Sequence, residues 1–234
     1  MCFLGIIPAR AGSKSIKNKN IIKLKNKPLI YYTIKAAKKS ILKNNFVVST
    51  DDPKILKICK ALKVKYFFKR PKKFSTDKTT AIQLLNYLIE DLEKKNFDFK
   101  NIVYLQPTSP FRDYKTINKA IKIFQKNSKL DSLISVCEVD SFHPARMKFM
   151  TKKNILLDNI YTEKKEGQNK QDLKKMYIRN GAIYIFKKKN LKKKTIKGKK
   201  SYGFVMTKKN SINIDSIDEL NYSKYLINKN LIKI

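Results

Sequence analysis

Short apolar segments alternate with helical patterns through most of the chain, and this alternation constrains the fold more than any other feature. Strands separated by helices favour a parallel sheet with right-handed crossover connections. The predicted fold class is therefore α/β, a doubly wound and mostly parallel sheet. Buried strands are predicted at residues 3–8, 46–50, 64–68, 102–105 and 132–139. Helices are predicted at residues 28–39, from Pro53 onward, at 79–95 and at 113–125.

Residues 141–177 interrupt the alternation. They are polar, rich in lysine and only weakly periodic, and loops of this length are uncommon unless they serve a function. We expect this segment, called the extension below, to pack on a partner subunit or to cover the site. Strand patterns resume at residues 182–186 and 203–206, and a helical pattern follows at 216–228. The predicted division is an α/β domain of residues 1–140 and 178–234, with the extension between its two parts.

The carboxyl ends of parallel strands lie at one edge of a sheet, and ligands bind beyond that edge. The loops expected to converge there follow Pro8, Thr50, Leu105 and Val139.

The chain carries 54 lysine and arginine residues against 18 aspartate and glutamate residues, a net charge of +36. One interpretation is a nucleic-acid or polyanion binder, because such a surface attracts polyanions. The lysines are nevertheless spread along the whole chain, with short runs only, at residues 187–189 and 192–194. Without an aromatic-interleaved basic stripe, a general compositional bias explains the charge more simply.

Arginine is rare against this background of lysine. A guanidinium binds phosphate or carboxylate through two parallel hydrogen bonds, which an ammonium cannot do. Each arginine is therefore a candidate ligand-binding residue, with a surface ion pair as the alternative. The five arginines are Arg10, Arg70, Arg112, Arg146 and Arg179.

Cys2, Cys59 and Cys137 are odd in number and widely spaced, which excludes a disulfide framework and a clustered zinc site. The apolar segments are far shorter than the roughly 18–20 residues of a membrane-spanning helix. The first residues also lack the pattern of a signal peptide. The expected location is the cytoplasm.

A turn of small residues follows the first predicted strand. Residues 8–20 contain Arg10, Gly12, Ser13 and two lysines, Lys14 and Lys19. Backbone amides in such a turn can hold phosphate oxygens while the cations offset their charge. The string is neither a dinucleotide-binding fingerprint nor a Walker loop. An ordinary strand-to-helix connection is the alternative.

Polar strings also follow or enter other predicted strands. Residues 106–112 hold Gln106, Thr108 and Ser109 between two prolines, a rigid group that suits a polyhydroxylated ligand or simply caps a turn. In residues 178–184, polar residues lead into a predicted strand that contains Tyr184.

The last polar string is residues 212–216. Strand-like alternation would place Asn213 and Asp215 on one face, where their oxygens suit Mg²⁺ together with substrate phosphates. The alternative is that Asp215 or Ser216 caps the last helix.

The ordered strings resemble those of the acylneuraminate cytidylyltransferases, the CMP-sialic acid synthetases and their bacterial nonulosonic-acid relatives. The resemblance runs from about residue 3 to residue 220. It rests on PARxGSKxIxxKN at residues 8–20, LQPTSPxR at 105–112, HPx(K/R) at 143–146, NGAIY at 180–184 and, imperfectly, DID at 213–215.

The resemblance implies transfer of CMP from CTP to the anomeric hydroxyl of a nine-carbon acidic sugar, with release of pyrophosphate. It also implies Mg²⁺ and a homodimer in which the extension supplies the contact. Matching positions imply catalytic roles for Arg10, Lys19 and Lys170. They imply CTP binding by Arg10, Gly12, Ser13, Lys14, Lys19, Asn20, Arg70 and Thr79. They imply sugar binding by Gln106, Thr108, Ser109, Arg146, Lys170, Gln171 and Tyr184, and metal binding by Asp215 and Asn213.

The chain departs from the family pattern at several positions. Ser15 and Lys17 stand where the family often has glycine and proline, and Lys170 stands where it commonly has arginine. Asn213 replaces the first aspartate of the metal pair and brings no charge. Two alternatives stay open: a cytidylyltransferase for pseudaminic or deoxy-octulosonic acid, and a basic polyanion-binding protein on the same fold.

Overall fold

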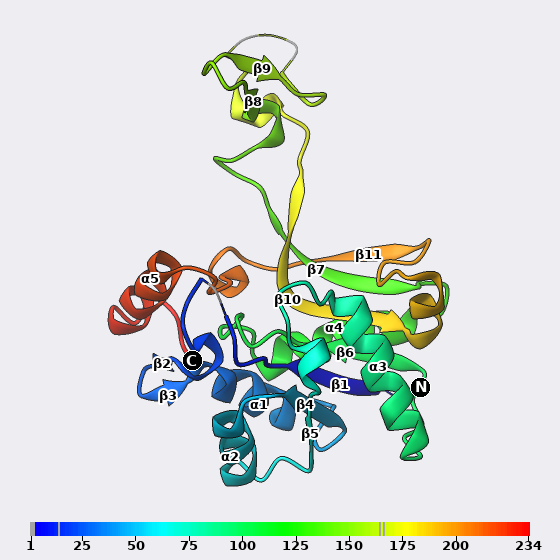
Figure 1. Ribbon diagram of the computed structural model, residues 1–234. Helices are drawn as coiled ribbons and strands as arrows, with labels where there is room; N and C mark the ends of the chain where they lie inside the picture. The colour runs from blue at the N-terminus through cyan, green and yellow to red at the C-terminus, as the bar shows by residue number, and fades with distance from the viewer. Residues whose placement is uncertain (1–2, 14, 164, 166) are drawn as a thin grey trace.

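The computed structural model describes residues 3–13, 15–163, 165 and 167–234 (Figure 1). Within these residues, seven strands form one sheet in the order β11-β7-β10-β6-β1-β4-β5. Its strands are β1 (Phe3–Pro8), β4 (Phe46–Thr50), β5 (Tyr66–Lys69), β6 (Asn101–Tyr104), β7 (Ser132–Glu138), β10 (Tyr177–Lys187) and β11 (Ser201–Val205). The helices are α1 (Leu29–Lys39), α2 (Pro53–Ala61), α3 (Ala81–Lys94), α4 (Tyr114–Lys126) and α5 (Ile217–Asn228).

The sheet is mostly parallel, as predicted. Strand β1 pairs in parallel with β4 and β6, and β11 pairs in parallel with β7. Strand β10 is antiparallel to both of its neighbours, β6 and β7, and it separates these two strands in the sheet. The sequence pattern did not indicate this insertion.

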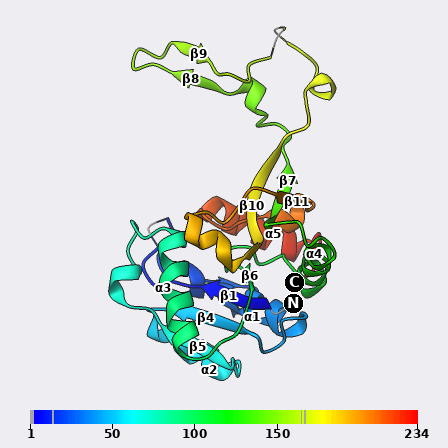
Figure 2. The same ribbon diagram turned by 90° about the vertical axis from the view of Figure 1, so that its right-hand side faces the viewer.

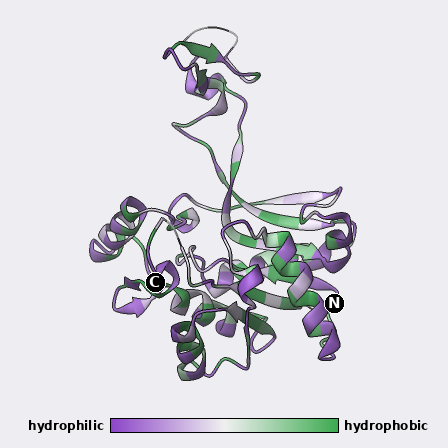
Figure 3. Ribbon diagram, in the orientation of Figure 1, coloured by the Kyte–Doolittle hydropathy of each residue, from purple (hydrophilic) through white to green (hydrophobic). Residues whose placement is uncertain are grey.

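Apolar side chains cover both faces of the sheet, because successive residues of a buried strand point to opposite sides. Ile7 and Val48 pack among residues of α1, α2 and α4, whereas Ile6 and Val47 pack among residues of α3. Figure 2 shows α3 and α4 on opposite sides of the sheet, and Figure 3 shows hydrophobic residues concentrated in its strands.

Side-chain hydrogen bonds cap the first turns of α2 and α3. Pro53 is the first residue of α2, as predicted, and the Asp52 side chain accepts a hydrogen bond from the Lys54 backbone amide at 2.8 Å. Thr80 and Gln83 form a reciprocal capping box at the start of α3. This cap fixes the chain that precedes α3, which lines the cleft described below.

The extension stands away from the sheet (Figure 1). Its two legs continue from the adjacent strands β7 and β10, and its far part holds the short hairpin of β8 (Lys148–Met150) and β9 (Leu156–Asp158). Exposed apolar side chains gather along it, among them Phe142, Phe149, Leu156 and Ile160. The described residues include no helix that is both long enough and apolar enough to cross a membrane.

Strand β10 is longer than the sequence pattern indicated. Residues 182–186 were the predicted strand, but pairing begins at Tyr177, opposite Glu138 of β7. Ile178 is exposed, so this part of β10 lacks the buried apolar pattern that marks a central strand. A register shift then separates Arg179 from Tyr184, and Gly181 lies inside it with φ of +76°. A Cβ atom on Gly181 would lie 2.6 Å from Oε1 of Gln106.

Gly181→Ala should therefore destabilise the protein, by about 1–3 kcal/mol, because alanine disfavours a positive φ and its methyl group would displace Gln106. Chemical denaturation measures the effect as a free energy of unfolding. Gly203→Ala in β11 is the matched control, since its Cβ would meet only Val136 Cγ2 at 3.7 Å. Equal stability of the two variants would contradict the bulge as the reason for this glycine.

Candidate active site

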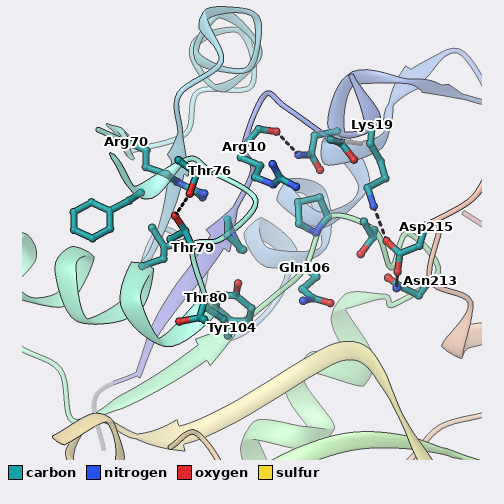
Figure 4. Close-up of a pocket in the computed structure, with 18 residues that line it drawn as sticks. Arg10, Lys19, Arg70, Thr76, Thr79, Thr80, Tyr104, Gln106, Asn213 and Asp215 are labelled. Atoms are coloured by element: carbon teal, nitrogen blue, oxygen red, sulfur yellow. Dashed lines mark hydrogen bonds and ion pairs between the residues drawn. The ribbon is translucent and has the colours of Figure 1, made fainter. Parts of the chain in front are cut away.

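A cleft of about 270 Å³ lies beyond the carboxyl ends of β1, β5 and β6 (Figure 4). We call it the main cleft. Its walls are the loop after β1, the segment between β5 and α3, the loop after β6 and the chain just before α5. Its lining residues are Pro8, Arg10, Ser13, Lys19, Asn20, Arg70, Phe74, Thr76, Thr79, Thr80, Ala81, Leu84, Tyr104, Gln106, Pro107, Thr108, Asn213 and Asp215.

Arg10 reaches into the main cleft from the loop after β1. Neighbouring groups hold its backbone: the Arg10 carbonyl accepts from Asn20 Nδ2 at 2.9 Å, and the Ala11 amide donates to Asp51 Oδ1 at 2.9 Å. The loop after β4 thus supports the loop after β1. The guanidinium itself forms an ion pair with Asp77, with Nη2 and Oδ1 2.6 Å apart.

Lys19 lies in the same cleft and pairs with a carboxylate from the far end of the chain. Its Nζ is 2.5 Å from Asp215 Oδ1, and Asn213 Nδ2 donates to the other oxygen of that carboxylate. Residues 212–215 form no strand, so the predicted alternation is wrong as a description of the backbone, although the two side chains do meet. The Ile214 amide donates to the Thr108 carbonyl at 2.8 Å and holds this segment against the loop after β6.

The structure also decides which residue caps α5. Ser216 is the cap, because its hydroxyl accepts from the Glu219 amide while the Glu219 carboxylate accepts from the Ser216 amide. Asp215 is therefore free of the capping role and faces the main cleft.

Arg70 forms the inner wall of the main cleft. It is buried, and it donates from Nη2 to the Ser49 carbonyl at 3.0 Å and from Nε to Ser49 Oγ at 3.3 Å. Burial lowers the pKa of Arg70, and the nearby hydroxyl of Tyr104 and carboxyl of Asp51 oppose that change. Burial also raises the pKa of Tyr104 to about 12. Arg70 is thus a fixed and partly desolvated positive group beside the cavity.

Threonines line the wall that faces Arg10. The hydroxyls of Thr76 and Thr79 are hydrogen-bonded to each other at 2.9 Å, and the Thr79 amide donates to the Thr76 carbonyl at 3.2 Å. Thr79 was predicted here, whereas Thr76, Thr80 and Tyr104 were not. Only the run of threonines at residues 76–80 offered a signal for two of them, and nothing in the strand pattern distinguished Tyr104.

A second cleft of about 530 Å³, called the side cleft, shares Gln106 and Asn213 with the main cleft. Arg179, Asn180, Gly181 and Tyr184 come to it from β10. The buried Asn180 side chain receives a hydrogen bond from Ser135 Oγ at 2.6 Å and donates to Ser211 Oγ at 2.8 Å. Asn180, next to Gly181, therefore connects β7, β10 and the chain before α5 at the side cleft.

Most sequence-predicted residues meet in these two clefts. The main cleft contains Arg10, Ser13, Lys19, Asn20, Arg70, Thr79, Gln106, Thr108, Asn213 and Asp215, and the side cleft contains Tyr184. Gly12 lies in the loop after β1, exposed and beside the Arg10 guanidinium, and Lys14 lies outside the described residues.

Four predicted sugar-binding residues do not line either cleft. Ser109 is fully buried, so its hydroxyl cannot meet a ligand in this structure. The other three, Arg146, Lys170 and Gln171, belong to the extension. Arg146 donates to the Gln168 carbonyl, and Lys170 pairs with Asp140. The predicted convergence of four loops is also wrong for the loop after Val139, which leads into the extension instead.

Comparisons with known proteins agree with this geometry. Residues 4–234 match the family model described as "Cytidylyltransferase". An N-acylneuraminate cytidylyltransferase of Streptococcus agalactiae is 33% identical over 217 residues, which are 92% of this chain and 50% of the relative. The chain thus spans about half the length of that relative. A pseudaminic acid cytidylyltransferase of Campylobacter jejuni is 32% identical over 229 residues, 97% of each chain.

The fold is also that of solved nucleotidyltransferases. A CMP:2-keto-3-deoxy-manno-octonic acid synthetase complexed with CTP superposes with a TM-score of 0.72 at 14% identity, covering 98% of this chain and 100% of that one. The family match over nearly the whole chain, together with these relatives, shows that the chain belongs to the cytidylyltransferase family.

Proposed function

We propose that this protein transfers CMP from CTP to the anomeric hydroxyl of a sialic-acid-like nonulosonic acid and releases pyrophosphate. The observation that carries the proposal is the convergence of Arg10, Lys19 and Arg70 on one cleft that opens into a second, polar cleft at Gln106. Three cations suit a triphosphate, and the adjoining cleft offers amide, hydroxyl and guanidinium groups to an acidic sugar. The names of the relatives support this assignment.

In this proposal, Arg10 and Lys19 hold the triphosphate and offset the charge that grows on the departing pyrophosphate. Arg70 and Asn20 form the nucleoside part of the main cleft, where buried polar groups reject a base that leaves them unpaired. Gln106 stands at the junction of the clefts and contacts the sugar next to the reacting phosphate. Tyr184 lies on the sugar side.

A divalent metal would have few protein ligands here. No group of three or more His, Cys, Asp and Glu side chains suited to a metal occurs in the described part of the chain. Asp215 offers one carboxylate, and Asn213 Oδ1 is buried without a hydrogen-bond partner. These two oxygens fit Mg²⁺ that is bound mainly through the nucleotide phosphates, where it would neutralise phosphate charge. Lys19, which now holds Asp215, would be released toward the triphosphate.

We expect Asp215→Ala to abolish nearly all turnover and Asn213→Ala to lose less, because only Asp215 carries charge. Asn213→Asp should tighten metal binding. Calorimetric titration of Mg²⁺, with and without CTP, measures metal binding and does not depend on turnover. Thermal unfolding of each variant is the control for folding. An Asp215→Ala variant with parental rate and parental Mg²⁺ dependence would contradict this metal site.

The protein also acts as a homodimer in this proposal. The extension carries Arg146, Lys170 and Gln171 away from the clefts of its own chain, so a role in sugar binding requires a second copy. Its apolar side chains support the same conclusion, since Ile160 is 90% exposed and Phe142 82% exposed.

Ile160→Lys should shift the protein from dimer to monomer, because a charge in an apolar contact must be desolvated. Light scattering after size-exclusion chromatography measures the mass. Ile41→Lys is the matched control, because Ile41 is an exposed isoleucine outside the extension. A parental mass for Ile160→Lys, or dissociation in both variants, would count against the extension as the dimer contact.

The reaction itself is tested by pyrophosphate release from CTP with sialic, legionaminic, pseudaminic and deoxy-octulosonic acids. CTP should far exceed UTP and ATP as the nucleotide. Pseudaminic acid is the second candidate substrate, because the similarity to the Campylobacter jejuni enzyme covers 97% of both chains. Equal turnover of the three nucleotides would refute the nucleoside assignment. No turnover, with salt-sensitive DNA binding, would favour the polyanion alternative.

A further inference from the structure

We infer that Asp77 is an internal counter-ion of the triphosphate subsite, which occupies Arg10 until the nucleotide's phosphates replace it. The inference rests on the proposed function, since it assigns Arg10 to the triphosphate. It adds a specificity-determining residue from outside the strings that carry the family resemblance. Asp77 makes binding depend on how much negative charge the ligand can offer to Arg10.

The ion pair joins two segments that are distant in the sequence. Arg10 belongs to the loop after β1, and Asp77 belongs to the segment between β5 and α3. The Arg10 Nη2 and Asp77 Oδ1 atoms are 2.6 Å apart, and the two side chains are 31% and 38% exposed. Both partners are therefore accessible to solvent and to a ligand, and the pair can be exchanged.

The backbone around Asp77 holds the carboxylate in place. Asp77 lies inside the turn closed by the amide of Thr79 and the carbonyl of Thr76, and the hydroxyls of these threonines bond across the same turn. The next residues enter the capping box of α3. Thr76 and Thr79 both line the main cleft (Figure 4). Asp77 lies between them in the sequence, and its ion pair with Arg10 connects this turn to the loop after β1.

Two carboxylates thus form ion pairs with two of the cations that line the main cleft. Asp215 pairs with Lys19 as Asp77 pairs with Arg10. Asp215 has a further use as a metal ligand in the proposed reaction, whereas Asp77 competes with phosphate for the guanidinium hydrogen bonds. A triphosphate brings enough charge to displace it. The nucleotide part of the product, with a single phosphate, brings less, so Asp77 should return to Arg10 and favour product release.

Asp77→Asn tests the inference with little change of shape. Calorimetric titration with cytidine, CMP, CDP and CTP, without metal, should show affinity gains that grow with the number of phosphates. We expect about 3–10-fold tighter binding of CTP and no change for cytidine, the scale of a partly exposed ion pair. The gain should shrink at high salt. Asp77→Glu keeps the charge and should bind like the parent.

Asp91→Asn is the matched control for net charge. Asp91 of α3 pairs with Lys95, the residue after the helix, also at 2.6 Å, and lines neither cleft. An equal gain in this variant would show a general charge effect and overturn the inference. Unchanged or weaker CTP binding by Asp77→Asn would overturn it as well, weaker binding showing that Asp77 orients Arg10. Asp77→Ser provides a second variant if thermal unfolding shows that Asp77→Asn is misfolded.

Inorganic tripolyphosphate separates this inference from the proposed function. Parent protein that binds tripolyphosphate but not CTP would refute the nucleotide assignment, while the comparison of Asp77→Asn with parent would still decide the role of Asp77. Parent protein that binds neither ligand would overturn both proposals. CTP binding with no difference between parent and Asp77→Asn would overturn the counter-ion alone.

Discussion

The arrangement of both clefts depends on a buried guanidinium. Arg112 is 1% exposed, and its guanidinium donates to three neutral oxygens: the carbonyls of Gln106 and Ala182, and the Thr33 hydroxyl. Burial lowers its pKa to about 9. A buried cation is costly unless hydrogen bonds satisfy it, and these bonds tie the loop after β6, strand β10 and helix α1 together. Arg112 and Thr33 both donate to the Gln106 carbonyl and so help to hold Gln106 between the two clefts.

The sequence predicted those parts of the fold in which burial leaves a local pattern. Strands β1 and β4 are continuous apolar segments because helices cover both of their faces, and the structure has them at the predicted residues. The start of β10 was missed because Tyr177 and Ile178 are exposed and are held by pairing with β7, some 40 residues earlier. The local hydrophobicity pattern of a segment does not identify the strand with which it pairs. The place of β10 between β6 and β7 could not be predicted for the same reason.

In the candidate site, too, some residues could be identified from the sequence and others could not. Scarcity of arginine drew attention to Arg10 and Arg70, which the structure places in one cleft. The same reasoning does not distinguish Arg112, whose guanidinium binds backbone carbonyls, from an arginine that meets a ligand. Tyr104 was missed because a tyrosine at the end of a buried strand resembles any core aromatic residue. The family resemblance also named residues of the extension, which the structure places outside both clefts, because a motif contains no information on how far a segment extends from the sheet.

The way the extension is attached has a consequence for how proteins of this family can diverge. Both of its legs leave from neighbouring strands, with Tyr177 of β10 opposite Glu138 of β7. The sheet therefore already holds the two ends together, and a longer or shorter segment between them adds little closure entropy. Insertions, deletions and new side chains can accumulate there without shifting the register of the strands that carry the clefts. The extension and the clefts can consequently change at separate rates on one chain.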